Sequence, residues 1–317
     1  MITLFTNVLS KYFNLTVTYS SEQEGGWSAR AFKISTTNGI YFLKVYDKQR
    51  TATAQWTSTI DVYMPIVIWL NNNTGLESKI LCPILTIDGQ YRCEDEHFIY
   101  LLFPYIDGYT LCDKQMSNTQ VKEIAEILAE LHRYGENIPV KTSAIIEDFS
   151  VPFCSELRNI LSSMDKQTDN ETVSILKEYE TILIKNVEET EILAQKLSKE
   201  NLKFVLCHTD VHGWNLMQYD KLILIDWEGM KLAPPEADLF AFIGDLFWHK
   251  CSKEFIAYYK KVNPDFIINT EVLTFYQIRR RIEDICAFAS GLLYENIDDD
   301  ERRQSLYHLR KECKMLS

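Results

Sequence analysis

The sequence predicts an α+β, bilobal fold with a small β-rich N-terminal lobe and a larger α-helical C-terminal lobe. The first hundred residues are rich in β-branched and aromatic residues between glycine-containing turns. After about residue 117, apolar side chains mostly recur at helical spacing. A chain of 317 residues is also too long for one small domain. We therefore place the N-terminal lobe at 1–103, a connector at 104–108 and the C-terminal lobe at 109–317.

The N-terminal lobe is predicted to contain four strand segments and one helix. The strand segments read LTVTYS, ARAFKIS, GIYFLKVY and RCEDEHFIYLLF, with Gly-Gly, Asn-Gly and Asp-Gly turn signals along the way. Residues 51–72 between them favour a single helix, which Pro65 is expected to disturb because it cannot donate a backbone hydrogen bond.

The C-terminal lobe is predicted to be almost wholly helical. The segment SNTQVKEIAEILAELHRYG opens with a Ser or Asn cap and shows apolar spacings of three and four. Residues 155–200 and 235–317 continue as helices, and only 203–207 and 221–226 have strand character.

Composition excludes several classes of protein. No stretch reaches the roughly 20 apolar residues that cross a bilayer, and the first residues, MITLFTNVLSKYFNL, lack the features of a secretion signal. We therefore expect a cytoplasmic protein without a membrane partner. The eight cysteines are scattered without a Cys-x-x-Cys pair, so reduced thiols are expected. A net charge of −12 argues against a nucleic-acid partner and favours cationic small molecules.

The most informative stretch is CHTDVHGWNLM at 207–217, followed by LILIDWEG. A metallohydrolase site could use His208, Asp210 and His212 from one face of a strand, but the other histidines are isolated. A polar turn with buried histidines explains one or two of these residues. It does not explain an apolar strand on each side and an acid at the end of the second.

A phosphotransferase explains the whole arrangement. Transfer of a phosphoryl group needs a carboxylate near the acceptor hydroxyl, and Asp210 is the candidate. It also needs oxygen ligands for the Mg²⁺ that bridges the nucleotide phosphates, and Asn215 and Asp226 can supply them. A loop between paired strands would bring these three side chains to one place.

The residues HTDVHGWN followed by LIDW resemble the catalytic loop of the aminoglycoside phosphotransferase and choline-kinase-like superfamily. Glycine is commoner in that family at the position of Thr209, and we expect this departure to have a small effect. Three further segments agree with the family in order and spacing: LLFPYIDG, LAELHRYG and PPEADLFAF. The resemblance implies a protein-kinase-like fold, ATP or GTP as phosphoryl donor, and a role for Asp238 in holding the backbone of the loop.

A kinase-like lobe needs a lysine on a central strand, paired with an acid on the adjoining helix. Lys44 lies in an apolar strand segment, and Asp61 is the only carboxylate between 48 and 76. We therefore expect Lys44 to contact the nucleotide and Asp61 to pair with it. Alternatives are Glu22 or Glu24 as the paired acid, or an edge-strand lysine that only reaches solvent.

The remaining nucleotide contacts rest on the resemblance. The segment EGGWSARAFKI resembles the loosened glycine loop of small-molecule kinases, where Gly26 and Ser28 would contact phosphate oxygens. The connector would meet adenine through the carbonyl of Pro104 and the N–H of Ile106.

The acceptor is expected to be a cationic small molecule. Glu283 and Asp284 follow three arginines in FYQIRRRIEDICAFASGLL, which is either an exposed ion-paired helix face or part of an acceptor site. This helix and the catalytic segments are most similar to spectinomycin phosphotransferases. The resemblance implies an aminoglycoside- or aminocyclitol-type antibiotic as acceptor. The alternatives are a metabolic kinase of choline, methylthioribose, fructosamine or homoserine, and a non-catalytic nucleotide-binding relative.

Overall fold

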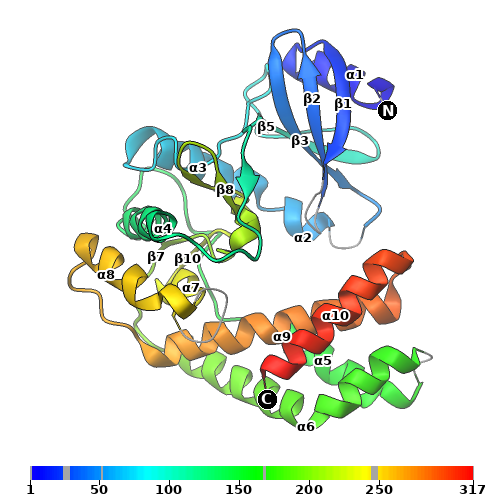
Figure 1. Cartoon of the computed structure of the whole chain (residues 1–317), viewed down its shortest axis with the longest axis vertical. Helices are drawn as coiled ribbons and strands as arrows, with labels where there is room; N and C mark the ends of the chain where they lie inside the picture. The colour runs from blue at the N-terminus through cyan, green and yellow to red at the C-terminus, as the bar shows by residue number, and fades with distance from the viewer. Residues whose placement is uncertain (1, 24–28, 51–52, 167–168, 244–248, 317) are drawn as a thin grey trace. The chain divides into compact units, whose positions relative to one another are not determined.

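The described residues of the computed structural model fall into two compact units (Figure 1). The description covers residues 2–23, 29–50, 53–166, 169–243 and 249–316. Unit 1 consists of Met1–Ile146, Phe204–Asp238 and Phe247–Phe266, and unit 2 of Glu147–Lys203, Leu239–Leu246 and Ile267–Ser317.

The N-terminal part of unit 1 is an antiparallel five-stranded sheet in the order β1-β2-β3-β5-β4 (Figure 1). Its strands are β1 Val17–Gln23, β2 Arg30–Thr36, β3 Gly39–Asp47, β4 Cys93–Glu94 and β5 Phe98–Pro104. In register, Lys44 lies opposite Ala31 of β2 and Leu101 of β5. Lys44 is therefore on a central strand, and the edge-strand alternative is wrong.

The two faces of β3 have different neighbours. Leu43 and Val45 join a buried apolar cluster together with Phe5 and Leu9 of α1 (Ile2–Phe13). Successive side chains of a strand point to opposite faces. Lys44 and Tyr46, two positions later on β3, are thus turned away from α1.

The helix expected over 51–72 is interrupted. It forms α2 (Thr53–Thr57) and α3 (Ile60–Asn73), which are separated at residues 58–59. Pro65 lies inside α3 and removes one backbone hydrogen bond there without ending the helix. Burial of apolar residues at spacings of three and four keeps α3 in place despite the proline: Ile60, Tyr63, Met64, Val67 and Leu70.

The rest of unit 1 surrounds the catalytic stretch with short elements. They are β6 Tyr109–Thr110, α4 Asn118–Leu131, β7 Val205–Cys207, η2 Gly213–Asn215, β8 Leu216–Gln218, β9 Leu222–Leu224, η3 Trp227–Gly229, β10 Lys231–Ala233, α7 Glu236–Leu239, η4 His249–Cys251 and α8 Ser252–Val262. Strands β6, β8 and β9 form one sheet, and β10 pairs with β7. The sequence predicted the regions of β7 and β9. It missed β6, β8 and β10, which are too short to show an alternating pattern.

Helix α4 begins with a capping box. The Ser117 hydroxyl accepts from the Gln120 backbone N–H, and the Gln120 side chain accepts from the backbone N–H of Ser117. This satisfies two donors that a helix start leaves unpaired. The sequence predicted a Ser or Asn cap, and the structure shows that Ser117 is the cap.

Unit 2 is built from long helices that pack on one another (Figure 1). They are α5 Pro152–Ser162, α6 Asn170–Leu197, α9 Thr270–Tyr294 and α10 Asp299–Met315, with the short η1 Met164–Lys166 after α5. Asp169, Asn269 and Asp298 cap α6, α9 and α10 with their side chains. The mixed fold, β-rich before residue 104 and mainly helical after it, confirms the predicted fold class.

The two units do not coincide with the lobes predicted at 1–103 and 109–317. Residues 204–238 group with the N-terminal sheet because the hairpin of β8 and β9 is bonded to the segment after α3. Leu224 donates to the carbonyl of Lys79 at 2.9 Å, and Leu81 donates to the carbonyl of Leu224 at 3.3 Å. The catalytic stretch is thus anchored to the part of the chain that carries Lys44.

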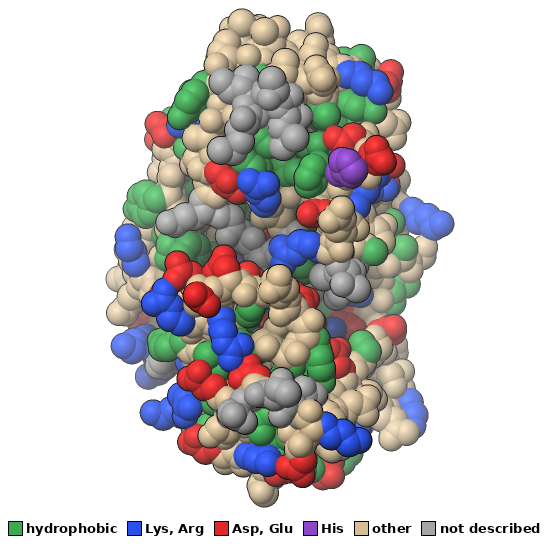
Figure 2. Space-filling model, turned by 90° about the vertical axis from the view of Figure 1, so that its right-hand side faces the viewer, with side chains coloured by type: hydrophobic (Ala, Val, Ile, Leu, Met, Phe, Trp, Pro, Cys, Tyr) green, Lys and Arg blue, Asp and Glu red, His purple; other side chains and the backbone are tan. Residues whose placement is uncertain are grey.

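The outer surface carries both signs of charge. On the face shown in Figure 2, Lys and Arg side chains are interspersed with Asp and Glu side chains. Among the described residues, no helix has the length and apolar character needed to cross a membrane.

Candidate active site

The catalytic loop begins where β7 ends and brings two predicted site residues together. The side-chain nitrogen of Asn215 donates to Asp210 twice, to the backbone carbonyl at 2.9 Å and to Oδ2 at 3.0 Å. Asn215 is buried, whereas the side chain of Asp210 is 34% exposed. The two bonds from Asn215 therefore orient Asp210, and part of its carboxylate stays accessible to a ligand.

Asp226 follows β9 and is linked to the same loop. The N–H of Ile225 donates to the carbonyl of Asn215 at 3.0 Å. Asp226 has a positive φ of 68°, and its Oδ1 accepts from Nζ of Lys44 at 2.7 Å. Asn215 and Asp226 thus lie on adjoining segments, as the expected metal ligands must.

A buried carboxylate holds the start of the loop. Asp238 is fully buried and accepts from the backbone N–H groups of His208 at 2.9 Å and Thr209 at 2.5 Å. Its Oδ2 also lies 3.0 Å from Nε2 of His132, whose Nδ1 is 2.7 Å from the Tyr259 hydroxyl. These bonds agree with the role that the family resemblance implied for Asp238.

His132, Cys207 and Asp238 lie close enough together to be considered as metal ligands. Their ligand atoms already have protein partners: both ring nitrogens of His132 are hydrogen-bonded, and the Cys207 thiol is near the carbonyls of Ala233 and Pro234. Asp238 accepts from backbone N–H groups. We interpret this cluster as the support of the catalytic loop rather than a metal site.

Thr209 has the backbone conformation that explains why glycine is commoner at this position. Its φ is 67°, in the left-handed region that penalises residues with a Cβ. The hydroxyl of Thr209 donates to the carbonyl of Gly229 at 2.7 Å, which joins the loop to η3. This bond offsets part of the strain.

Lys44 lies in a half-buried cluster with two acids. Its Nζ donates to Asp226 at 2.7 Å and to Oε1 of Glu228 at 2.9 Å. The hydroxyl of Tyr46 donates to the same oxygen of Glu228. Burial alone would lower the pKa of Lys44, but Asp226 and Glu228 raise it above its ordinary value. Lys44 is therefore charged at any physiological pH.

Glu228 has a raised pKa, because burial outweighs the opposing effect of Lys44. Sequence reasoning missed Glu228 and Tyr46. The signal that could have identified them is their spacing. Each lies two residues after a predicted site residue, Glu228 after Asp226 and Tyr46 after Lys44 on the same face of β3.

The expected pairing of Asp61 with Lys44 is not what the structure shows. Asp61 is 52% exposed and pairs with Arg92 at 3.2 Å. It occupies the second position of α3, and the buried face of that helix is made by its neighbours. The alternative acid Glu22 pairs with Arg30, and Glu24 lies outside the described residues.

The other predicted nucleotide contacts remain predictions. Gly26 and Ser28 lie outside the described residues. Pro104 ends β5 opposite Tyr41, and Ile106 is half-buried two residues later. The connector thus continues from the strand that neighbours β3.

The two predicted acceptor-binding acids lie on α9, within unit 2. Asp284 is half-buried and pairs with Arg280 at 2.9 Å, whereas Glu283 is exposed. Arg279 pairs with Glu147 and Arg281 with Glu312. Both acids thus lie close to arginines of the same helix, Asp284 to Arg280 and Glu283 to Arg279.

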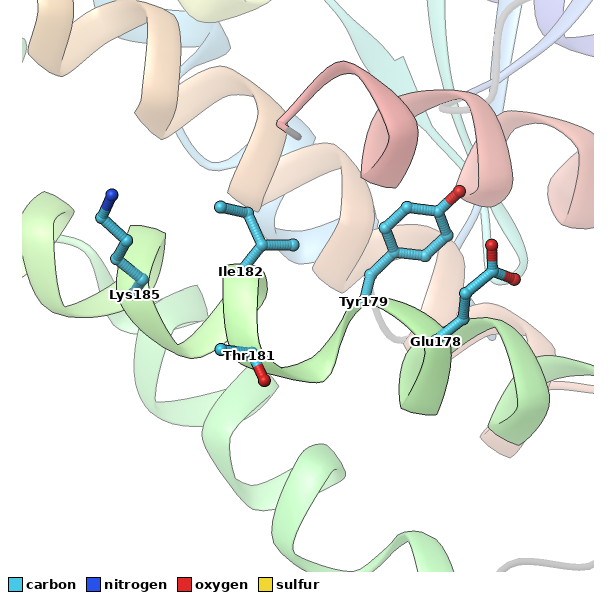
Figure 3. Close-up of a pocket in the computed structure, with 5 residues that line it drawn as sticks. All are labelled: Glu178, Tyr179, Thr181, Ile182 and Lys185. Atoms are coloured by element: carbon cyan, nitrogen blue, oxygen red, sulfur yellow. The ribbon is translucent and has the colours of Figure 1, made fainter.

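A shallow hollow on α6 lies apart in sequence from the residues of the candidate active site (Figure 3). It is lined by Glu178, Tyr179, Thr181, Ile182 and Lys185. Glu178 pairs with Arg310, and Tyr179 packs against the apolar cluster of unit 2. None of the residues proposed for phosphoryl transfer contributes to this hollow.

The strain at Thr209 leads to a stability prediction. Thr209→Ala should lower the free energy of unfolding by about 1 kcal/mol, because it removes the bond to Gly229 while the left-handed backbone stays strained. Thr209→Gly loses the same bond but relieves the strain, so it should cost less. Urea denaturation checks this, and equal losses in the two variants would contradict it.

His208 leads to a prediction about pH. It is fully buried, and its pKa is lowered from 6.5 chiefly by burial, against the opposing effects of Asp238 and Asp210. Below pH 6.5 the unfolded chain binds a proton at His208 that the folded chain does not. Stability from this group is therefore lost as the pH falls, by up to about 1.4 kcal/mol per unit.

The measurement is the free energy of unfolding from urea denaturation at pH 7.5, 6.5 and 5.5. His208→Gln cannot titrate, so its deficit relative to the unchanged chain should shrink as the pH falls. The control is His97→Gln, which alters an exposed histidine. A deficit that is the same at all three pH values would contradict the prediction.

Comparison with solved structures confirms the fold. The chain is similar to spectinomycin phosphotransferase in complex with ADP and spectinomycin, with a TM-score of 0.79 and 20% identity over 99% of this chain and 97% of that one. It is also similar to the choline kinase LicA from Streptococcus pneumoniae, with a TM-score of 0.62 and 18% identity over 99% and 98%. A microcompartment-associated aminopropanol kinase gives 0.64 and 12% over 100% and 96%.

A search of curated protein sequences gives no match. The profile of the phosphotransferase enzyme family, in contrast, matches residues 21–265, which is most of the chain. This range contains Lys44 and the whole catalytic stretch, so it confirms the resemblance and the enzyme class predicted from the sequence. The chain belongs to the phosphotransferase enzyme family.

Proposed function

We propose that this phosphotransferase moves the γ-phosphoryl group of ATP, or of GTP, to a hydroxyl of an aminoglycoside- or aminocyclitol-type antibiotic similar to spectinomycin, and so confers resistance. The observation that carries the phosphotransfer is the arrangement of Asp210, Asn215, Asp226 and Lys44 within unit 1. The similarity to a spectinomycin phosphotransferase over nearly the full length of both chains supports the acceptor class.

Asp210 is the residue that acts on the acceptor. One of its carboxylate oxygens accepts from Asn215, which fixes the orientation of the group. Its partial exposure lets an acceptor hydroxyl approach. Asp210 would orient that hydroxyl and accept its proton as the new phosphate ester bond forms.

The site also fits Mg²⁺. The nitrogen of the Asn215 amide is directed at Asp210, so its oxygen would be the ligand atom that joins the carboxylate of Asp226. Oxygen ligands of this kind are those that Mg²⁺ prefers. Asp226 already contacts one cation, the ammonium group of Lys44. When bound, Mg²⁺ would neutralise charge on the nucleotide phosphates.

The location and the partners follow from the same proposal. The nucleotide and a cationic acceptor are its small-molecule partners, and neither a nucleic acid nor a membrane is needed. The cytoplasmic location expected from the sequence is where both substrates would meet the enzyme.

Asp210 and Asp226 should respond differently to mutation. Asp210→Asn should lower kcat by about a hundredfold or more, the usual scale for loss of a general base, while binding of Mg–nucleotide is kept. Asp226→Ala should instead weaken binding of Mg–nucleotide. Steady-state kinetics and calorimetry separate the two effects.

A control variant for this pair is Asp220→Asn, which removes an exposed carboxylate from the turn between β8 and β9. Both kcat and nucleotide affinity should stay unchanged in this variant. The role given to Asp210 is wrong if Asp210→Asn turns over near the rate of the unchanged enzyme.

The acceptor proposal predicts a specific role for Glu283. Glu283 is the more exposed of the two acids, so it is the better candidate to contact a cationic acceptor. A charge-assisted contact contributes roughly 1.5–3 kcal/mol, so Glu283→Gln should raise the acceptor KM about ten- to a hundredfold. The nucleotide KM should not change. Asp284→Asn should have a smaller effect on the acceptor KM.

The experiment begins with a panel of aminocyclitols, aminoglycosides and amino alcohols as acceptors. Glu295→Gln, at the exposed C-terminal end of α9, is the matched control. The antibiotic assignment fails if the best acceptor is uncharged, or if neither Glu283→Gln nor Asp284→Asn changes the acceptor KM.

A metabolic kinase is the second candidate. The similarities to choline kinase and aminopropanol kinase favour small amino alcohols as its acceptors. In the same panel, this candidate requires an amino alcohol to give a higher kcat/KM than any antibiotic. A non-catalytic relative is disfavoured because all four transfer residues are retained. Asp210 contacts Asn215, and Lys44 contacts Asp226.

A further inference from the structure

Lys44 needs an acid partner other than the one expected on the helix. Its side chain is only 16% exposed, and an ammonium group with so little contact with water is costly without paired charges. Asp61 of α3 is bonded to Arg92 at the surface. The partners of Lys44 come instead from the turn that follows β9.

The two acids in that turn have different surroundings. Asp226 contacts Lys44 through Oδ1, and its side chain is 28% exposed. Glu228 contacts Lys44 through Oε1, and its side chain is 15% exposed. The more exposed carboxylate is the one that can reach a metal ion from the nucleotide side.

Glu228 is fixed from a second direction by the sheet. The hydroxyl of Tyr46 donates to the same Oε1 that accepts from Lys44. Tyr46 is fully buried, and it lies on the same face of β3 as Lys44 because the two are two positions apart. Oε1 of Glu228 is therefore occupied by two donors from one strand.

A metal ion on Asp226 would change the balance at Lys44. Asp226 would then bind the ion through the carboxylate that now accepts from Lys44, and the ammonium group of Lys44 would be repelled by the added positive charge. Glu228 would then be the acid that stays bonded to Lys44 while Lys44 contacts the nucleotide phosphates.

We propose that Glu228, oriented by Tyr46, is the positioning residue that holds Lys44 toward the nucleotide phosphates and allows Asp226 to change from Lys44 to the metal. This inference rests on the proposed roles of Lys44 and Asp226. Glu228, in the turn after β9, would thus do what was expected of Asp61 on α3.

The test is a double-mutant cycle read by calorimetric binding of ADP, with and without Mg²⁺. Glu228→Gln keeps the size of the side chain and removes its charge. It should weaken ADP binding about tenfold under both conditions, the scale of a lost charge-assisted bond. In a Lys44→Met background, the same change should have no further effect, because Glu228 acts through Lys44.

Tyr46→Phe provides a second variant that removes only a hydroxyl. It should weaken ADP binding several-fold, and it should have no further effect in the Glu228→Gln background. Asp220→Asn is the control for a general change of charge. Thermal unfolding of each variant shows that the weaker binding belongs to a folded protein.

Several outcomes would overturn the inference. Glu228→Gln removes a repulsive charge near the phosphates, so tighter ADP binding would mean that repulsion outweighs positioning. An equal loss with and without Lys44, confined to solutions with Mg²⁺, would make Glu228 a metal ligand. Loss of ADP affinity in Asp61→Asn but not in Glu228→Gln would mean that Asp61 of α3, and not Glu228, positions Lys44.

The cycle does not depend on the acceptor. A chain that binds ADP but phosphorylates no antibiotic would contradict the proposed acceptor and leave the roles of Glu228 and Tyr46 to be decided by the cycle. A chain that binds no ADP would overturn both proposals.

Discussion

The buried carboxylate of Asp238 is the interaction on which the geometry of the transfer site depends. It accepts from the backbone N–H groups of His208 and Thr209 and lies beside a ring nitrogen of His132. A buried charge is tolerated only when donors surround it, so carboxylate and loop stabilise each other. The residue after this anchored pair is Asp210. Its position is therefore set by buried backbone contacts rather than by its own partly exposed side chain.

The second constraint is the charge balance around Lys44. One ammonium group and two carboxylates, Asp226 and Glu228, are held together where they have little contact with water. Because the carboxylates outnumber the ammonium group, the arrangement favours binding of a further cation. A metal–nucleotide complex brings such a cation, and its phosphates can pair with Lys44. Nucleotide binding would thus replace contacts within the protein with contacts to the ligand. The hydroxyl of Tyr46, which donates to Glu228, would keep that carboxylate in place during this exchange.

The sequence could predict the part of the site that is contiguous along the chain. Asp210, Asn215 and Asp226 belong to one loop and the strand that follows it, so their spacing predicted that they lie close together, and the roles proposed for them rest on that placement. The partner of Lys44 could not be found in this way, since Asp226 is 182 residues away and the contact depends on packing of the catalytic turn against β3. Asp61 was the only acid between residues 48 and 76, where the adjoining helix was expected, but the buried face of α3 turns it toward Arg92. The short strands β6, β8 and β10 are also products of packing.

The backbone strain at the site also depends on packing, which holds several residues in unfavourable conformations. Among the described residues with a side chain and a positive φ are Thr209 and Asp226, which bracket the catalytic loop, and Cys112, whose backbone lies against Gly213. Such conformations cost of order 1–3 kcal/mol each and persist only where the surroundings fix them. A Cβ on Gly213 would collide with the carbonyl of Cys112, so the loop approaches that backbone closely. Asp238 and the hydroxyl of Thr209 provide bonds that offset the strain. The carboxylates are therefore held in place before any ligand binds, which reduces the reorganisation that phosphoryl transfer requires.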